Sequence, residues 1–131
     1  MDINGDVVTV PSTASTLLTG SFVAGDISSA ASGARAVSGF ITGATVTGGI
    51  DGVGGNMFIT VAVTFPSIGT SNYTVSLTQT GGPNLNGLLI NGNAFISSPL
   101  VLNKTATGFT VYLLEYKGIG QSAAYDVILV K

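Results

Sequence analysis

Few side chains in this sequence are able to carry out chemistry. The chain has no His, no Cys and no Trp, and its six carboxylates are Asp2, Asp6, Asp26, Asp51, Glu115 and Asp126. Two carboxylates held at a suitable distance can act as general acid and general base. Glu115 and Asp126 are expected on neighbouring strands, where they could pair with each other or with Lys117. A structural ion pair is the favoured interpretation, ahead of a catalytic pair.

Other catalytic and metal sites lack their usual residues. Serine is abundant, but without His no Ser-His-Asp triad can form, and nothing singles out one Ser for a Ser-Lys dyad. Metal sites built from His or Cys are excluded, and Ca²⁺ would need clustered oxygen ligands that the sequence does not show. The glycine-rich run 48–55 is not followed by Lys-Ser/Thr, nor by a helix, so it predicts a hairpin loop and no phosphate site. We therefore expect no enzyme, no metal and no cofactor.

The charge of the chain is unusually low. Only 8% of its residues are charged, against about a quarter in an ordinary soluble domain. From Ala36 to Asn103 the one charged side chain is Asp51. The four cations do not cluster, so a nucleic-acid partner is not expected. A surface with so few charges favours self-association, and we expect other subunits to cover much of it.

Alternating hydrophobicity predicts an all-β fold with no helix longer than about three turns. The clearest strand is 57–65, with its odd-numbered residues apolar and its even-numbered residues mixed. Phe109 begins a later strand that is mostly apolar on both faces, and the strand 123–130 is similar. One face of each should therefore be covered by the sandwich itself and the other by the first 45 residues or by a neighbouring subunit. We expect an antiparallel, jelly-roll-like β-sandwich. The predicted strands are residues 6–10, 16–23, 35–46 (bent or bulged), 57–65, 73–80, 88–90, 95–102, 109–116 and 123–130.

The chain length of 131 residues fits a single domain. Within it, residues 1–45 are expected to form an irregular or extended N-terminal third, a candidate arm for attachment or oligomerisation that includes the small-residue-rich segment 24–33, whereas 46–131 form the sandwich. The acidic N-terminus lacks the basic region of a signal peptide. The apolar stretch 17–24 is too short and too polar to cross a bilayer. The sequence therefore predicts synthesis in a cytoplasm and no membrane insertion.

The C-terminal part of the chain resembles a known family. Its motifs are the run 59–66 (ITVAVTFP), the tripeptide 73–75 (YTV), the run 103–112 (NKTATGFTVY) and the closing strand 123–130 (AAYDVILV). Together they resemble the receptor-binding β-sandwich at the C-terminus of many tailed-bacteriophage tail fibres. The resemblance covers roughly residues 57–131. In physical terms, Gly108 would allow a tight turn and Phe109 would anchor the next strand in the core.

This resemblance implies a function and a set of contact residues. It implies a non-enzymatic protein of the virion surface, a short tail fibre or receptor-binding knob, which works as a homo-oligomer, expected to be a trimer, beside other virion proteins. Loops 50–56 and 81–87 would bind a host surface glycan. The candidate contact residues are Asn56, Asn84 and Asn86, which would hydrogen-bond the glycan, and Tyr112 and Tyr116, which would stack on a sugar ring.

Other functions stay open at this point. The short chain and its uncharged, hydroxyl-rich surface also suit a head decoration protein that cements capsid subunits. A cellular adhesin or sugar-binding module is the third hypothesis. An ice-binding protein is disfavoured because no regular Thr-X-Thr array recurs.

Overall fold

The computed structural model describes Gly5 and residues 15–26, 33–50, 57–81, 95–96, 98–116 and 122–131, and all of its regular elements are β-strands. The expected all-β sandwich is therefore confirmed. The strands are β1 (Leu17–Asp26), β2 (Gly33–Ala34), β3 (Val37–Gly39), β4 (Gly43–Ile50), β5 (Met57–Thr64), β6 (Thr74–Gly81), β7 (Phe95–Ile96), β8 (Leu100–Thr105), β9 (Gly108–Tyr116) and β10 (Ser122–Val130). Within the described ranges no helix is long and apolar enough to cross a membrane.

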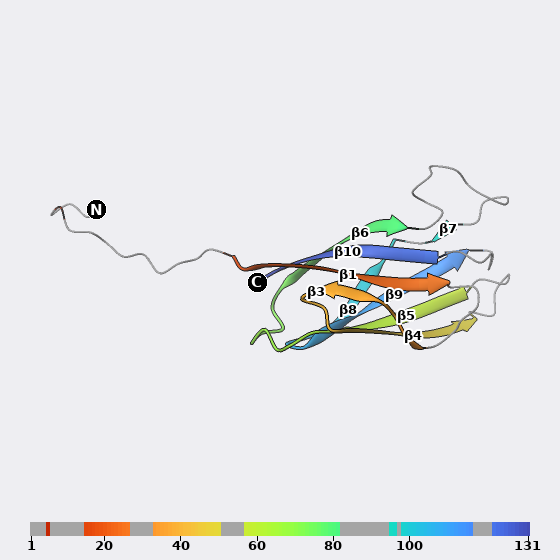
Figure 1. Cartoon of the computed structure of the whole chain (residues 1–131), viewed down its shortest axis with the longest axis horizontal. Helices are drawn as coiled ribbons and strands as arrows, with labels where there is room; N and C mark the ends of the chain where they lie inside the picture. The colour runs from red at the N-terminus through yellow and green to blue at the C-terminus, as the bar shows by residue number, and fades with distance from the viewer. Residues whose placement is uncertain are drawn as a thin grey trace.

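The first sheet has four strands in the order β3-β1-β10-β6, which run side by side in Figure 1. All of its pairings are antiparallel, and the longest joins β1 to β10 along nearly their whole length. β1 thus lies inside the sheet, between β3 and β10. Residues 17–26 belong to the sandwich, which corrects the expectation of an irregular N-terminal third that reaches to residue 45.

The second sheet has six strands in the order β2-β4-β5-β9-β7, with β8 also paired to β9. Its centre is the antiparallel trio β4, β5 and β9, in which Val46 pairs with Val61 and Val61 with Val111. β7 and β8 meet β9 at successive positions, since Phe95 pairs with Tyr116 and Leu100 with Tyr112.

The core lies between the two sheets and follows the alternation in the sequence. Every second residue of a strand points to the same face, so one set from each sheet is buried. Both of the two-sided apolar strands, β9 and β10, direct one set inward. The buried apolar residues are Phe22, Ala24, Ile41, Ala44, Val46, Ile59, Val61, Val63, Phe65, Tyr73, Phe109, Val111, Leu113, Ala123, Tyr125, Val127 and Leu129.

Aromatic rings close one end of this core. The ring of Phe65 lies 5.1 Å from that of Phe40, 6.0 Å from that of Phe109 and 6.2 Å from that of Tyr73, measured between centroids. Tilted and edge-on pairs at these distances add to the stability that burial alone gives. The burial of Phe109, predicted from the sequence, is confirmed.

The segment 35–46 is not the single bulged strand expected from its sequence. The chain leaves the second sheet after β2, crosses to the first sheet as β3, and returns as β4. Gly39 makes the return possible because its φ is +67° and a Cβ there would lie 2.2 Å from the carbonyl oxygen of Thr19. Gly39 and Gly43, which interrupt the apolar residues of this segment, therefore mark a change of sheet and not a bulge.

The other predicted strands agree with the structure where it describes them. Residues 16–23, 57–65, 73–80, 109–116 and 123–130 correspond to β1, β5, β6, β9 and β10. The predicted strand 95–102 is divided into β7 and β8. The predictions for 6–10 and 88–90 lie outside the described residues.

Candidate interaction surface

The outer face of the six-stranded sheet is built from the residues that alternate with the core set. The strand register places these residues in rows that cross the sheet. One row consists of Thr47, Thr60, Tyr112 and Leu100, and the next consists of Ala34, Thr45, Ala62, Thr110 and Leu102. We call these two rows, with Phe58 and Leu114 beside them, the outer face.

An aromatic pair lies in the middle of the outer face. The rings of Phe58 and Tyr112 stack with their centroids 5.9 Å apart and an angle of 21° between their planes. The two residues are on neighbouring strands, in diagonal positions, because Phe58 pairs with Leu114, which follows Tyr112 by two residues. Both side chains are half-buried within the single chain. Rigid aromatic groups of this kind supply much of the energy of protein interfaces.

Apolar side chains continue from this pair to the edge strand β8. Leu100 is 54% exposed and Leu102 is 39% exposed, two of the largest apolar exposures in the described chain. Four strands spaced about 4.8 Å apart and about 26 Å long give a flat area of roughly 500 Å². One partner contributes ~800 Å² to a standard stable interface, so this face corresponds to the low end of specific interfaces.

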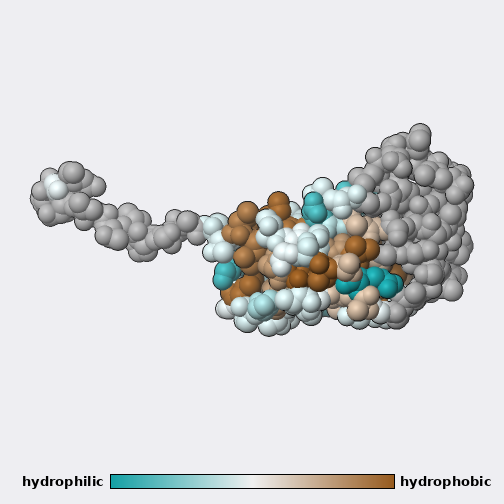
Figure 2. Space-filling model, in the orientation of Figure 1, coloured by the Kyte–Doolittle hydropathy of each residue, from teal (hydrophilic) through white to brown (hydrophobic). Residues whose placement is uncertain are grey.

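The two rows of the outer face contain no charged residue. Lysines near this sheet are held at the end of the sandwich. The Lys104 ammonium donates a 2.7 Å hydrogen bond to the carbonyl of Tyr73, and the Lys131 ammonium donates one of 2.7 Å to the carbonyl of Ile68. In Figure 2, which shows one face of the molecule, brown and near-white residues cover much of the described surface, with a few teal residues among them. Depletion of charge is typical of the centre of a protein interface.

The predicted contact residues are distributed unevenly. Tyr112 lies on the outer face, stacked on Phe58, and not in a loop. Tyr116 is the last residue of β9, and its side chain lies outside the described part. Asn56, Asn84 and Asn86 also lie outside it, so their grouping with the tyrosines stays a prediction. The sequence placed Phe58 on the same face of its strand as Thr60, but it gave no sign that Leu100 and Leu102 would continue this surface.

Neither acid-base nor metal chemistry is supported by the residues that the structure describes. Among them, no group of three or more His, Cys, Asp or Glu side chains could hold a metal ion. Asp126 is exposed on the outer side of the four-stranded sheet, between Ser21 and Thr78. Glu115 belongs to β9 of the other sheet, paired with Met57, so the two residues are not on paired strands. The expected pairing of Glu115 with Asp126 across neighbouring strands is therefore wrong, whereas the alternative partner Lys117 lies outside the described residues.

Comparisons with known proteins add no relative: no family model matches the chain, and no curated protein or solved structure matches it.

Proposed function

We propose that this chain is a non-enzymatic structural protein of the bacteriophage virion surface, which assembles into a homotrimer and serves as a short tail fibre or receptor-binding knob. The proposal joins two lines of support. The sequence resemblance over roughly residues 57–131 supplies the phage context. The physical character of the outer face supports the assembly.

The motifs that carry the resemblance have clear physical roles in the sandwich. Phe109, which follows Gly108 in the run 103–112, is 3% exposed and packs near Phe65. Gly108 lies against β5, where a Cβ would be 2.3 Å from the carbonyl oxygen of Val63. Its role is a close approach between strands, rather than the tight turn expected from the sequence. The two motifs 59–66 and 103–112 thus pack directly against each other.

The observation that carries the proposal is the outer face with its Phe58–Tyr112 pair. A soluble monomer seldom leaves a continuous uncharged, half-apolar surface of this size in water. Further copies of the chain are the partners that fit, because three such faces packed around a threefold axis bring no like charges together. An area of roughly 500 Å² per copy corresponds to the low end of specific interfaces.

A single lysine tests the assembly. Ala62 is exposed in the middle of the outer face, so Ala62→Lys would bring several ammonium groups together in an assembled particle without disturbing the core. Light scattering at micromolar concentration should show a multimer for the unchanged chain and a monomer for Ala62→Lys. The matched control is Ser76→Lys, exposed on the other sheet, which should stay multimeric. A monomeric unchanged chain, or a multimeric Ala62→Lys chain, would contradict the proposal.

The virion role needs an observation on whole particles. Antibodies raised against the purified chain, carried on gold, should label the tail of the phage that encodes it, and particles lacking the protein should adsorb poorly to their host. Labels spread over the head, with normal adsorption and loss of heat resistance, would replace the receptor-binding role with head decoration. Particles that carry no label at all would contradict both roles.

A further inference from the structure

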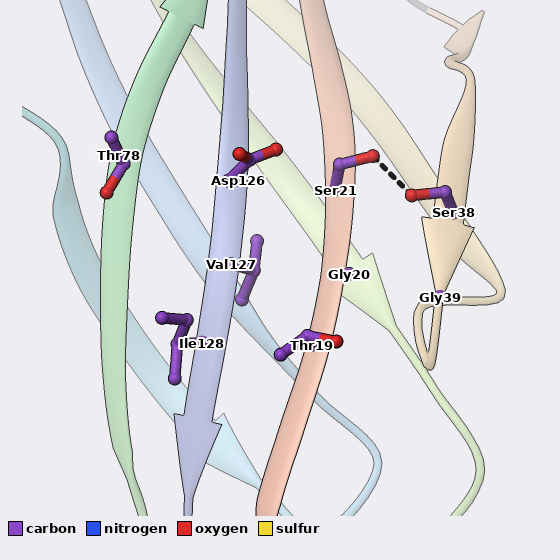
Figure 3. A pocket seen from close by; sticks show the side chains of 9 residues that line it. All are labelled: Thr19, Gly20, Ser21, Ser38, Gly39, Thr78, Asp126, Val127 and Ile128. Atoms are coloured by element: carbon purple, nitrogen blue, oxygen red, sulfur yellow. Dashed lines mark hydrogen bonds between the residues drawn. The ribbon is translucent and has the colours of Figure 1, made fainter.

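A shallow groove lies on the opposite side of the sandwich, on the outer face of the four-stranded sheet (Figure 3). Its volume is about 470 Å³, within the range of roughly 300–1,000 Å³ typical of small-molecule sites. The register places four polar side chains in one row across it: Ser38 pairs with Ser21, Ser21 with Asp126, and Asp126 with Thr78. We call Ser38, Ser21, Asp126 and Thr78 the polar row; Figure 3 shows one member on each strand.

Two glycines shape the side of the groove next to β3. Gly20 pairs with Gly39, and a Cβ on Gly20 would lie 2.6 Å from the carbonyl oxygen of Ser38. Without side chains at these positions β3 lies close against β1, and the hydroxyls of Ser21 and Ser38 hydrogen-bond to each other. Two members of the polar row are therefore held in place before any ligand arrives.

The groove also has an apolar side. Ile128 lies two residues after Asp126, on the same face of β10. It pairs with Thr19 and is 41% exposed. Val127 contributes only its backbone to the lining, because its side chain is buried in the core. A ligand that fits must therefore offer hydroxyl groups along one edge and a C–H surface on the other.

The chemistry of the polar row selects among ligand classes. The Ser21 and Ser38 hydroxyls share one donated proton, so this pair and Thr78 leave two hydroxyl donors for a ligand, and the Asp126 carboxylate can accept hydrogen bonds from two neighbouring hydroxyls. No cation is among the described residues that line the groove, and the Asp126 charge would repel phosphate, sulfate or an acidic sugar. A single carboxylate also gives too few ligands for Ca²⁺, which takes six to eight oxygens. A neutral polyhydroxylated compound remains.

We propose that this groove binds a neutral hexose unit of a glycan, with Asp126 accepting hydrogen bonds from two vicinal hydroxyls and Ile128 contacting the ring. The site rests on the proposed receptor-binding function and gives it a ligand class. It is separate from the loops predicted from the sequence, and it leaves the outer face of the other sheet free for assembly.

The test uses the whole chain labelled with ¹⁵N and four neutral sugars as probes: glucose, galactose, mannose and N-acetylglucosamine. Each sugar is added to about 50 mM, well above the ~1 mM dissociation constant typical of a shallow exposed site. At least one should shift the amide signals of Gly20, Gly39 and Val127. Asp126→Asn, which keeps the shape but not the charge, should weaken binding at least tenfold. N-acetylneuraminic acid, which is charged, should not bind.

Controls separate a lost site from a damaged fold. Asp126 and Thr47 are both exposed on strands, but on opposite sides of the sandwich, so Thr47→Ala should bind sugar normally. Ser21→Ala should weaken binding while its amide spectrum elsewhere stays unchanged. The proposal is overturned if no neutral sugar shifts these amides, or if Thr47→Ala weakens binding as much as Asp126→Asn.

The outcome also separates this inference from the proposed function. If the chain binds no sugar but antibodies against it still label phage tails, the inferred sugar site is wrong and the proposed virion role stands. Sugar binding by a chain that labels no particle would keep the groove as a sugar site and remove the virion role.

Discussion

The hydroxyl of Tyr73 lies 2.7 Å from the carbonyl oxygen of Gly108, to which it donates a buried hydrogen bond. The carbonyl of Thr105 is also within reach, at 2.9 Å. Tyr73 immediately precedes β6 in one sheet, whereas Gly108 begins β9 in the other, so this contact joins the two sheets at one end. Within the six-stranded sheet, the backbone N–H of Phe65 donates to the Thr107 carbonyl at 2.9 Å, next to Gly108.

Removing this hydroxyl should weaken the joint. Tyr73→Phe removes the shorter of two hydrogen bonds that the Gly108 carbonyl accepts, since the Thr105 hydroxyl donates the other at 3.2 Å, and we expect the free energy of unfolding to fall by about 1 kcal/mol. Urea denaturation measures it. Tyr112→Phe is the matched control, since that hydroxyl belongs to the half-buried outer face and should change stability by less than about 0.5 kcal/mol. Equal effects in the two variants would show that the Tyr73 contact does not stabilise the fold.

Two glycines that pair with the same residue should respond differently to alanine. Gly43 and Gly108 both pair with Thr64. A Cβ on Gly43 would meet the Thr64 hydroxyl, which can rotate away, whereas a Cβ on Gly108 would lie 2.3 Å from the Val63 carbonyl, which cannot. We expect Gly108→Ala to lose about 1–3 kcal/mol of stability and Gly43→Ala to change it by less than about 0.5 kcal/mol. Similar melting of both variants would refute the close-approach role.

Tyr125 should make the fold sensitive to alkali. Its hydroxyl is buried without a hydrogen-bond partner in the described part of the chain, and burial raises its pKa to about 12. Up to about pH 10 both folded and unfolded states keep this proton. Between about pH 10 and about pH 12 the unfolded state loses it first, so stability falls as pH rises, by an amount on the order of 2 kcal/mol.

The variant Tyr125→Phe isolates this effect. At neutral pH we expect its stability to equal or exceed that of the unchanged chain by up to about 1 kcal/mol, because an unpaired hydroxyl is removed. Urea denaturation from about pH 8 to about pH 11 should show a smaller alkaline loss in the variant. Some loss should remain, since burial also raises the pKa of Tyr73. Identical pH profiles would mean that Tyr125 ionises normally.

Phe109 and Phe58 test the two sides of the same sheet. Phe109→Ala empties a buried site and should cost about 3–5 kcal/mol of stability. Phe58→Ala removes a half-buried ring from the outer face, so it should cost less stability and instead weaken association. Thermal melting and light scattering on both variants distinguish these effects. Unchanged melting of Phe109→Ala would place its ring outside the core.

The alternation of apolar residues was sufficient to predict most strands and their buried faces. In β5 and β9 every second residue from Ile59 to Val63 and from Phe109 to Leu113 is buried, because a pleated strand leaves no other arrangement. The pattern could not reveal that residues 35–46 change sheets. A glycine with positive φ and a glycine in a bulge look alike in sequence, and only long-range pairing distinguishes them.

The polar row is a second feature that the sequence could not supply. Its four members come from strands that are far apart along the chain, and they meet only through the order β3-β1-β10-β6. One local sign existed: Asp126 is the single polar residue among the even-numbered positions from 124 to 130. That sign identifies an exception, but not the hydroxyls that surround it.

The pairing of Thr16 with Lys131 has a mechanical consequence. The two residues exchange backbone hydrogen bonds of 2.9 and 3.0 Å beside the start of β1 and the end of β10. Tension applied between these two residues would separate β1 from β10 by breaking their backbone hydrogen bonds one after another from this end. Tension applied between Thr16 and a ligand held at Asp126 acts along the strands instead. It loads several of the hydrogen bonds between β1 and β10 at once, in shear. A particle tethered at that end and pulled by a bound host would therefore load the sandwich in its mechanically stronger direction.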